Sequence, residues 1–205
     1  MVSDDSGKEI DDWDLYYKEN KVEEMPWYEK ELDLDLEKEI KSRNISGGKF
    51  LDIGTGPGTQ AIQLAKLGFE STGADISKNA IEKAAKLALN VNFVVDDILE
   101  SSFADNEFDF ILDRGCFHVF DPSLREKYLT QIKRILKDDG TLFLKVMSKE
   151  DTTLSEGRGP NKFSEQEVLD AFENSFDVNS IRPTVYYCRM NPLPKAIFAV
   201  IKQKN

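Results

Sequence analysis

The sequence predicts an α/β fold in which a mostly parallel, doubly wound sheet of seven strands carries helices on both faces. Short apolar runs alternate with helical patterns from residue 49 to residue 147, as in parallel strands joined by crossover helices. A stretch of three glycines follows the first apolar run, where folds of this kind bring a ligand against the backbone. The 205 residues are enough for one domain with a small appendage.

The first part of the chain, residues 1–46, is predicted to be a helical cap or lid, and residues 47–205 are predicted to be the main domain. Residues 1–12 are charged and polar, as at a frayed chain start. An apolar residue then recurs every four positions and predicts an amphipathic helix over 28–43, before a pair of glycines. The recurring residues are Leu32, Leu36 and Ile40.

The predicted strands are short apolar or β-branched runs that end at glycines, acids or turn residues. The run at 91–95 has an unbroken apolar centre, which is typical of a strand covered on both faces. In chain order the predicted strands are 50–53, 70–74, 91–95, 108–112, 141–147, 178–189 and 195–203.

The helices between these strands begin at recognisable capping residues. Ser77 is the predicted N-cap of one helix, and two others open with the Ser-x-x-Glu pattern of a capping box, at Ser123 and at Ser164. The predicted helices are 59–67, 77–89, 123–137 and 164–174.

The doubly wound topology predicts where a ligand binds. Ligands lie outside the carboxyl ends of the parallel strands, at the point where the strand order reverses. The loop after the first strand, 54–58, and the loop after the fourth, 113–118, are therefore expected side by side over one crevice.

The glycine loop is the sharpest motif, because residues 51–59 read LDIGTGPGT between a strand and a helix. Gly54, Gly56 and Gly58 allow a tight turn and a close approach of a ligand; a tight turn alone is the alternative. The spacing differs from that of dinucleotide sites, and residues 54–63 contain no Lys or Arg to meet phosphate. The loop therefore favours a ligand without a polyphosphate.

Acidic residues close the next two strands. Asp75 follows Gly58 by 17 residues and can accept hydrogen bonds from a ribose diol; the alternative is that it caps the following helix. Asp96 and Asp97 close the third strand and can accept from the amine of adenine; the alternative for Asp97 is a solvated loop acid. Ribose and adenine without phosphate, beside the acidic Asp52, indicate an adenosine ligand with positive charge.

With these motifs the sequence resembles the class I, Rossmann-like S-adenosylmethionine-dependent methyltransferases over about Phe50 to Met147. LDIGTGPGT is similar to the first motif of that family, and VNFVVDDILESSFADNEFDFILDRGCFHVF is similar to its third-strand to fourth-strand stretch. The resemblance implies S-adenosyl-L-methionine as the cofactor and an antiparallel hairpin at the C-terminal end of the sheet. The cofactor contacts that it implies are Trp27, Asp52, Gly54, Thr55, Gly56, Gly58, Asp75, Ile76, Asp97, Ile98, Asp113 and Arg114.

In that family the segment 113–118 borders the methionine part of the cofactor and the methyl acceptor. His118, the only histidine, is the candidate general base or acceptor-orienting group; the alternative is a half-buried structural histidine. Cys116 is expected to be a small buried hydrophobe rather than a nucleophile. The candidate acceptor contacts are Tyr17, Tyr28, Cys116 and His118.

The N-terminal segment is rich in aromatic residues at 13–17 and 25–28. It resembles the segment that closes over the cofactor in small-molecule methyltransferases of the thiopurine and tellurite-resistance kind. Aromatic faces there can attract the sulfonium and exclude water. The alternative is a helix that merely packs on the edge of the domain.

The predicted function is methyl transfer to a small molecule, with a thiol or another soft nucleophile preferred because no dedicated base is evident. One alternative is a protein-lysine methyltransferase that takes a basic protein segment, since the turn at 113–115 is similar to an Asp-Lys-Gly turn in some such enzymes. A second alternative is a protein that binds S-adenosylmethionine without catalysis. A nicotinamide dehydrogenase is disfavoured by the glycine spacing.

The charge and composition exclude several other classes. The net charge of −11 argues against nucleic acid as the main partner. No apolar run reaches the length of a membrane helix, and the acidic start is no secretory signal. Cys116 and Cys188 lie 72 residues apart (188 − 116) and make neither a metal spacing nor a disulfide framework, so no metal and a cytoplasmic location are predicted.

Overall fold

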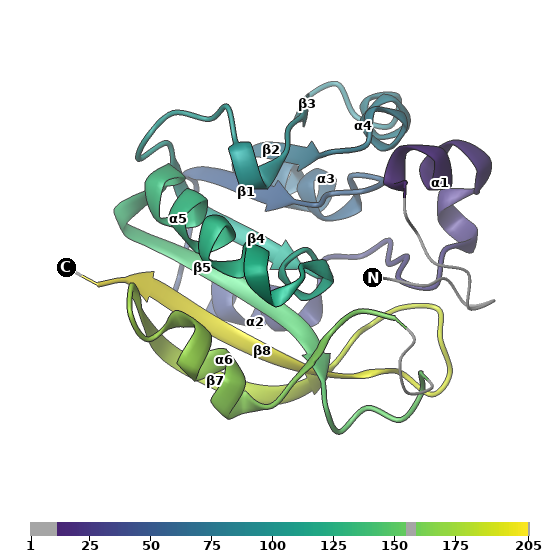
Figure 1. Ribbon diagram of the computed structural model, residues 1–205. Helices are drawn as coiled ribbons and strands as arrows, with labels where there is room; N and C mark the ends of the chain where they lie inside the picture. Colours follow the sequence, from purple (N-terminus) through teal and green to yellow (C-terminus); the bar gives the residue numbers. More distant parts are fainter. Residues whose placement is uncertain (1–11, 155–158, 205) are drawn as a thin grey trace.

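The computed structural model describes residues 12–154 and 159–204, and the charged start at 1–11 lies outside them. One sheet runs through the molecule in the order β3-β2-β1-β4-β5-β8-β7 (Figure 1). Its strands are β1 (Lys49–Ile53), β2 (Glu70–Asp75), β3 (Asn92–Val95), β4 (Phe108–Arg114), β5 (Leu136–Ser148), β7 (Phe176–Val185) and β8 (Lys195–Gln203).

The strands β1 to β5 are parallel to one another, and β8 is antiparallel to both of its neighbours, β5 and β7. The mostly parallel, doubly wound sheet and its C-terminal antiparallel hairpin are therefore confirmed. A further two-residue strand, β6 (Lys162–Phe163), pairs with the end of β5 and was not predicted.

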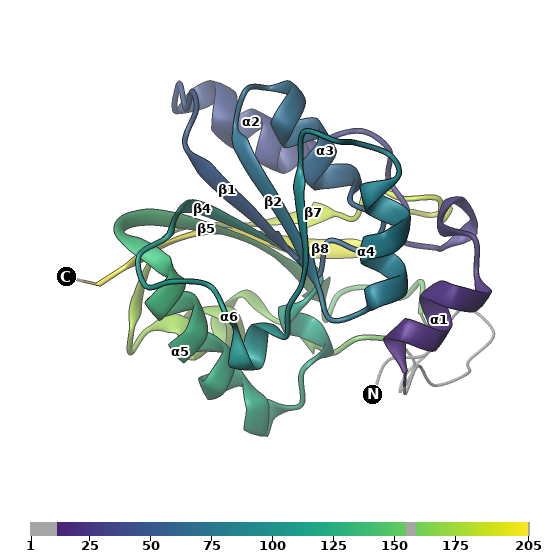
Figure 2. The same ribbon diagram turned by 90° about the horizontal axis from the view of Figure 1, so that it is seen from above.

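The helices are α1 (Trp13–Glu19), α2 (Leu34–Ser42), α3 (Thr59–Lys66), α4 (Lys78–Ala85), α5 (Arg125–Ile135) and α6 (Glu165–Phe172), with short 3₁₀ turns η1 (Val22–Glu24), η2 (Ile98–Glu100), η3 (Phe117–Val119) and η4 (Pro122–Leu124). Seen from above, α2 and α3 lie on one face of the sheet and α5 and α6 on the other (Figure 2). Within the part of the chain that the structure describes, no helix is long and apolar enough to cross a membrane.

Each face of the sheet has its own apolar core. On one face Leu36 and Ile40 of α2 and Leu64 of α3 pack on Phe50 and Phe143. On the other face side chains of α5 and α6 pack on the opposite side of the same strands; these include Tyr128, Ile132, Val168 and Phe172. The helix α2 thus shares the core of the sheet, while α1 belongs to a separate small cluster with α4.

The first predicted helix, 28–43, is wrong at its start, because the helix begins only after Asp33. The carboxylate of Asp33 accepts a hydrogen bond from the N–H of Asp35 (3.0 Å) and so caps α2. The same carboxylate is buried against Lys145 and Arg114. The residues before Leu34 are therefore not helical, and Asp33 lies against Lys145 and Arg114.

The expectation that strand 91–95 is covered on both faces is wrong. The strand β3 is the edge of the sheet, pairs only with β2, and leaves Val95 half exposed. The apolar run reflects contacts on one side only, with Phe93 packed beneath the glycine loop.

One of the two predicted capping boxes is present. Ser164 accepts from the N–H of Glu167, whose carboxylate accepts from the N–H of Ser164. The box at Ser123 does not form, because Asp121 accepts hydrogen bonds from both the N–H and the hydroxyl of Ser123. This helix consequently opens as the turn η4 and continues as α5.

Candidate active site

A cavity of about 340 Å³ lies at the carboxyl ends of the parallel strands. Its floor is the glycine loop after β1, and the loop after β4 lies beside it, as the topology predicts. A methyl side chain at Gly54 would lie 3.2 Å from Cβ of Cys116, so the two loops are in contact. Two segments that are far apart in the sequence form further walls, 13–29 near the N-terminus and 186–194 in the connection between β7 and β8.

Asp75 organises the floor of the cavity. One carboxylate oxygen accepts from the N–H of Gly56 and the other from the N–H of Ser77, each at 2.9 Å. The hydroxyl of Ser77, and not Asp75, accepts from the N–H of Ala80 and caps α4. Burial raises the pKa of Asp75. Asp75 lines the cavity and each of its oxygens can accept a further hydrogen bond, which is what a ribose diol requires.

Asp52 is a second buried carboxylate in the cavity wall. The hydroxyl of Thr55 donates a hydrogen bond to it at 2.5 Å. Burial raises the pKa of Asp52 to about 7, although the hydroxyl of Thr55, the backbone of Ala61 and the charge of Arg114 stabilise the charged form. A cation placed in the cavity would favour its ionised form.

The two acids after β3 are held differently. One oxygen of Asp97 accepts from the N–H of Leu99 and caps η2. One oxygen of Asp96 accepts from the N–H and hydroxyl of Ser102, and its other oxygen is buried without a hydrogen-bond partner in the described part of the chain. Both acids line the cavity, so Asp96 stays a candidate ligand acceptor beside Asp97, the acid that the family resemblance singled out.

Two residues predicted to touch the cofactor lie outside the cavity wall. Asp113 is fully buried, and its carboxylate accepts from three backbone N–H groups of the following turn and from the hydroxyl of Tyr128 (2.7 Å). Gly58 has a φ of +76°, and a side chain there would collide with Phe93. The first residue shapes the loop after β4, and the second lets α3 start against the sheet.

Arg114 is the single cation in the cavity wall among the described residues, and each of its three nitrogens already donates one hydrogen bond. Its guanidinium donates to the carboxylate of Asp33 (3.0 Å), to the carbonyl of Tyr187 (2.6 Å) and to the carbonyl of Trp27 (3.3 Å). Arg114 thereby joins the N-terminal and C-terminal walls, and Asp33 compensates its charge.

His118 and Cys116 line the cavity from the loop after β4, beside the glycine loop. Burial, with a smaller contribution from the charge of Arg114, lowers the pKa of His118 to about 3, so the ring is neutral at physiological pH. Burial raises the pKa of the Cys116 thiol well above its ordinary value, and nearby carboxylates such as Asp113 add to this effect. Neither group suits general-base or nucleophilic chemistry at neutral pH.

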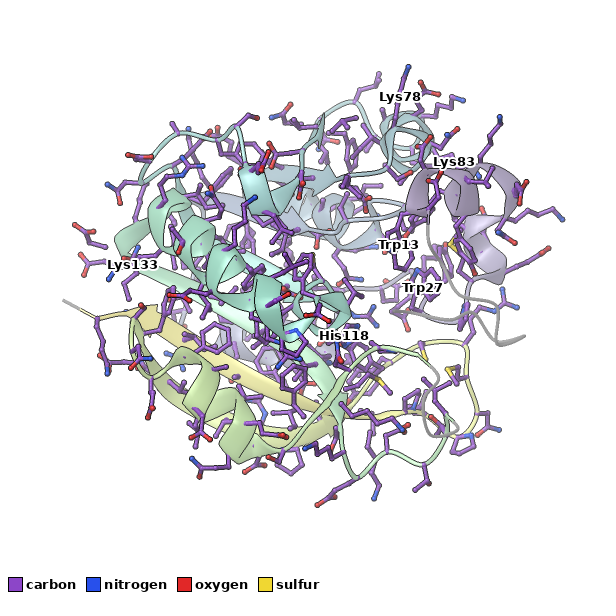
Figure 3. All side chains as sticks on the ribbon, in the orientation of Figure 1. Trp13, Trp27, Lys78, Lys83, His118 and Lys133 are labelled. Carbon is purple, nitrogen blue, oxygen red and sulfur yellow. The ribbon has the colours of Figure 1, made fainter. Side chains whose placement is uncertain are left out.

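The N-terminal aromatic segment forms one side of the cavity, through Trp13, Tyr17, Trp27 and Tyr28. The ring centroids of Trp13 and Trp27 are 5.9 Å apart, and both side chains lie at the same end of the sheet as His118 (Figure 3). The hydroxyl of Tyr17 reaches the glycine loop at Gly56.

Hydrogen bonds with α4 hold α1 in this place. The carboxylate of Asp14 accepts from the hydroxyl of Ser77 (3.0 Å) and from the backbone and side-chain N–H groups of Asn79 (2.7 and 2.8 Å). In return the ammonium of Lys83 donates to the carbonyls of Tyr17 and Asn20. Asp14 thus caps the N-terminal end of α4, and Lys83 caps the C-terminal end of α1.

The sequence did not reveal two parts of the site. The connection between β7 and β8 lines the cavity with Tyr186, Cys188, Met190 and Pro194. A buried ionic cluster behind Arg114 places Nζ of Lys145 2.6 Å from Asp33 and 2.8 Å from Asp35. Lys145 interrupts the apolar run of β5, which indicates a buried ion pair. Its partners Asp33 and Asp35 are far away in the sequence and could not be identified from it.

These residues fit a positively charged adenosine derivative. The carboxylates of Asp75 and Asp96 offer acceptors for a sugar and a base, and Ile76, Ile98 and Leu99 offer an apolar wall. No lysine lines the cavity within the described ranges, and Arg114 is engaged elsewhere, which does not suit a polyphosphate. The described residues also include no cluster of three potential metal ligands.

Comparison with known proteins relates this geometry to methyl transfer. A family model described as a methyltransferase domain matches residues 50–140. An uncharacterized methyltransferase of Schizosaccharomyces pombe, C750.03c, is 36% identical over 103 residues, which cover 48% of this chain and 71% of that protein.

Two longer matches have named substrates. EEF1A lysine methyltransferase 2 of Danio rerio is 26% identical over 171 residues, covering 77% of this chain and 67% of that protein. A 2-heptyl-1-hydroxyquinolin-4(1H)-one methyltransferase of Mycobacteroides abscessus is 29% identical over 167 residues, covering 79% and 73%.

Solved structures share the fold. A structure that concerns the conversion of a disulfide bond into a thioacetal group during echinomycin biosynthesis has a TM-score of 0.81 at 20% identity, covering 94% of this chain and 92% of that one. The 1,6-didemethyltoxoflavin-N1-methyltransferase of Burkholderia thailandensis, solved with 1,6-didemethyltoxoflavin and S-adenosylhomocysteine, has a TM-score of 0.66 at 20% identity, covering 83% and 78%.

Proposed function

Since the chain belongs to the class I, Rossmann-like methyltransferases that use S-adenosyl-L-methionine, we propose that it methylates a small, largely apolar molecule. The observation that supports this proposal is the enclosure of the cavity by the two ends of the chain. Aromatic residues of 13–28 and the apolar residues of 186–194 line the same cavity of about 340 Å³ as the glycine loop and Asp75, so little room remains beside a bound cofactor. A confined apolar space selects a compact acceptor.

In this proposal the glycine loop and the acids after β2 and β3 hold the cofactor. Gly54 and Gly56 let it approach the backbone, Asp75 accepts from its ribose, and Asp96 with Asp97 accept from its base. When bound, S-adenosylmethionine supplies a methyl group activated for in-line displacement. The contribution of the chain is to hold the acceptor in line at close range and to exclude water.

The acceptor chemistry follows from the charges in the wall. Asp52, Asp75 and Glu29 are acidic, and the charge of Arg114 is already compensated by Asp33. A thiolate would find no free cation among the described residues of the wall, so the preference for a thiol that the sequence suggested gains no support here. His118 is too weak a base to activate a protonated acceptor. A neutral nitrogen or oxygen nucleophile suits this wall better.

A protein-lysine acceptor is the second candidate. Its support is the similarity to EEF1A lysine methyltransferase 2 over 171 residues, together with an aromatic and acidic wall that would tolerate an amine. The covering segments 13–28 and 186–194 would have to leave a channel for a lysine side chain. The cytoplasmic location and the absence of a nucleic-acid partner stay predictions from the sequence.

Two measurements test the proposal in order. Calorimetry should detect binding of S-adenosylmethionine and S-adenosylhomocysteine but not of NAD; binding of NAD alone would contradict the cofactor assignment. A methyl-release screen over heteroaromatic amines, phenols, thiols, carboxylates and elongation-factor extracts should then give turnover with a small molecule. Turnover only with the extract would favour the lysine acceptor, and binding without any turnover would favour a non-catalytic protein.

A further inference from the structure

The imidazole ring of His118 is locked in one orientation and one tautomer. Its Nδ1 accepts a hydrogen bond from the backbone N–H of Met147 at 3.2 Å. A backbone N–H can only donate, so Nδ1 carries a lone pair, and the proton of the neutral ring is on Nε2. His118 as a whole residue is 7% exposed.

The surroundings of the ring add no competing proton. The hydroxyl of Tyr186 lies 3.5 Å from Nδ1 but donates to the carbonyl of Lys145 at 2.7 Å. Asn161 holds the backbone carbonyl of His118 through two N–H groups, each at 2.9 Å. Backbone and ring are therefore both fixed before any ligand binds.

The Nε2 edge of the ring is the side that remains for a ligand. His118 and Gly115 both line the cavity, and no described residue forms a hydrogen bond with Nε2. A side chain at position 115 would place its Cβ 3.0 Å from Nε2, so the glycine keeps this edge open. Nε2–H is thus a donor without a partner among the described residues, and a ligand that covered it without accepting its hydrogen bond would bind less well.

We propose that the Nε2–H of His118 donates a hydrogen bond to the methyl acceptor, which therefore carries a neutral nitrogen or oxygen lone pair beside its apolar part. This inference rests on the proposed function and deepens it, because it names a chemical requirement on the acceptor. His118 is then a specificity-determining donor and not a general base. Acceptors of the same shape without such a lone pair would leave the donor unsatisfied.

Two substitutions separate the two edges of the ring. His118→Asn keeps an oxygen near the position of Nδ1, where it can accept from Met147, but does not reach the position of Nε2. His118→Gln reaches further and can place an amide N–H at the cavity edge. Quinoline and naphthalene are suitable probes, since they share one shape and only quinoline has a neutral ring nitrogen.

The closing experiment begins with ¹⁵N NMR of the uniformly labelled full chain, where the single histidine gives an unambiguous signal. We expect Nε2 protonated and Nδ1 unprotonated at pH 7; the opposite tautomer or a charged ring overturns the proposal. Calorimetry with S-adenosylhomocysteine on the same sample tests the proposed function separately, and failure to bind there counts against that function alone.

Probe binding to the chain saturated with S-adenosylhomocysteine then tests the donor. Wild type and His118→Gln should bind quinoline about tenfold more tightly than naphthalene, as expected for one buried hydrogen bond. His118→Asn should bind the two probes equally. An equal affinity in wild type, including no measurable binding of either probe, or the same preference in His118→Asn, overturns the donor role.

Discussion

The carboxylate of Asp75 joins the glycine loop to the start of α4 and lines the cavity. We expect Asp75→Asn to weaken S-adenosylmethionine binding by about tenfold to a hundredfold, because an amide offers one acceptor oxygen where the ribose needs two. Calorimetry measures the effect, with the exposed Asp138→Asn as the matched control. Equal dissociation constants for both variants would reject the ribose contact.

The buried carboxyl of Asp52 makes cofactor binding depend on pH. Its pKa of about 7 means that the free protein ionises it only as the pH rises through neutrality. A cationic ligand favours the ionised form, so affinity for S-adenosylmethionine should rise from pH 5.5 to about 8 and then level off. Binding below pH 7 should release a proton, which calorimetry in buffers of different ionisation enthalpy detects.

Two controls test whether this pH dependence comes from Asp52 and from the positive charge of the ligand. Asp52→Asn should bind with an affinity that does not change over the same range, because the ionisable group is gone. S-adenosylhomocysteine lacks the sulfonium charge and should show a smaller slope with the wild type. A slope that persists in Asp52→Asn would assign the titration to another group.

Among the elements, the contact between α1 and α4 holds the aromatic segment at the cavity. Lys83 of α4 donates to the carbonyls at the end of α1, and Asp14 of α1 accepts from the start of α4. The small cluster that they surround is separate from the two main cores. We therefore expect that α1 can detach while the sheet stays folded.

We predict that Lys83→Met loosens α1 and weakens S-adenosylmethionine binding several-fold, with little change in the melting temperature. Trp13 and Trp27 are the only tryptophans and both lie in this segment, so their fluorescence reports its position (Figure 3). Their emission should shift to the red and become more accessible to acrylamide. Lys78→Met, on an exposed position of the same helix, is the control. Identical spectra for the two variants would contradict a role of this contact in the lid.

Local sequence patterns predicted some of the elements correctly and missed features of others. The apolar periodicity predicted α2, and a serine at the right spacing predicted the starts of α4 and α6. The position of β3 at the edge of the sheet and the start of α2 after Asp33 were missed. Both depend on which residues approach from elsewhere in the chain, and local spacing does not contain that information.

Across the whole molecule, a buried ionic cluster joins both ends of the chain to the middle strands. Burial alone would raise the pKa of Asp33, but Lys145 and Arg114 lower it below its ordinary value. Lys145 also contacts Asp35, at 2.8 Å. Through Arg114 the same cluster reaches the carbonyls of Trp27 and Tyr187, so the walls of the cavity and the stability of the fold depend on one set of charges.

Lys145→Met should lower the free energy of unfolding by about 3–5 kcal/mol, because it leaves two buried carboxylates short of a cation. Urea denaturation at pH 7 measures this change. Lys133→Met, on the exposed face of α5, is the control and should stay within about 0.5 kcal/mol of the wild type. A similar effect of the two substitutions would show that the cluster adds no net stability.

The doubly wound sheet, the glycine loop and the acid that closes β2 could be predicted, because each follows from spacing within one strand and its turn. That Asp113 and Gly58 lie outside the cavity wall, that the connection between β7 and β8 lines it, and that Nδ1 of His118 accepts from Met147 became visible only in the folded molecule. The physical reason is that burial and hydrogen-bond partners set the direction of a side chain, and these partners come from segments distant in the sequence.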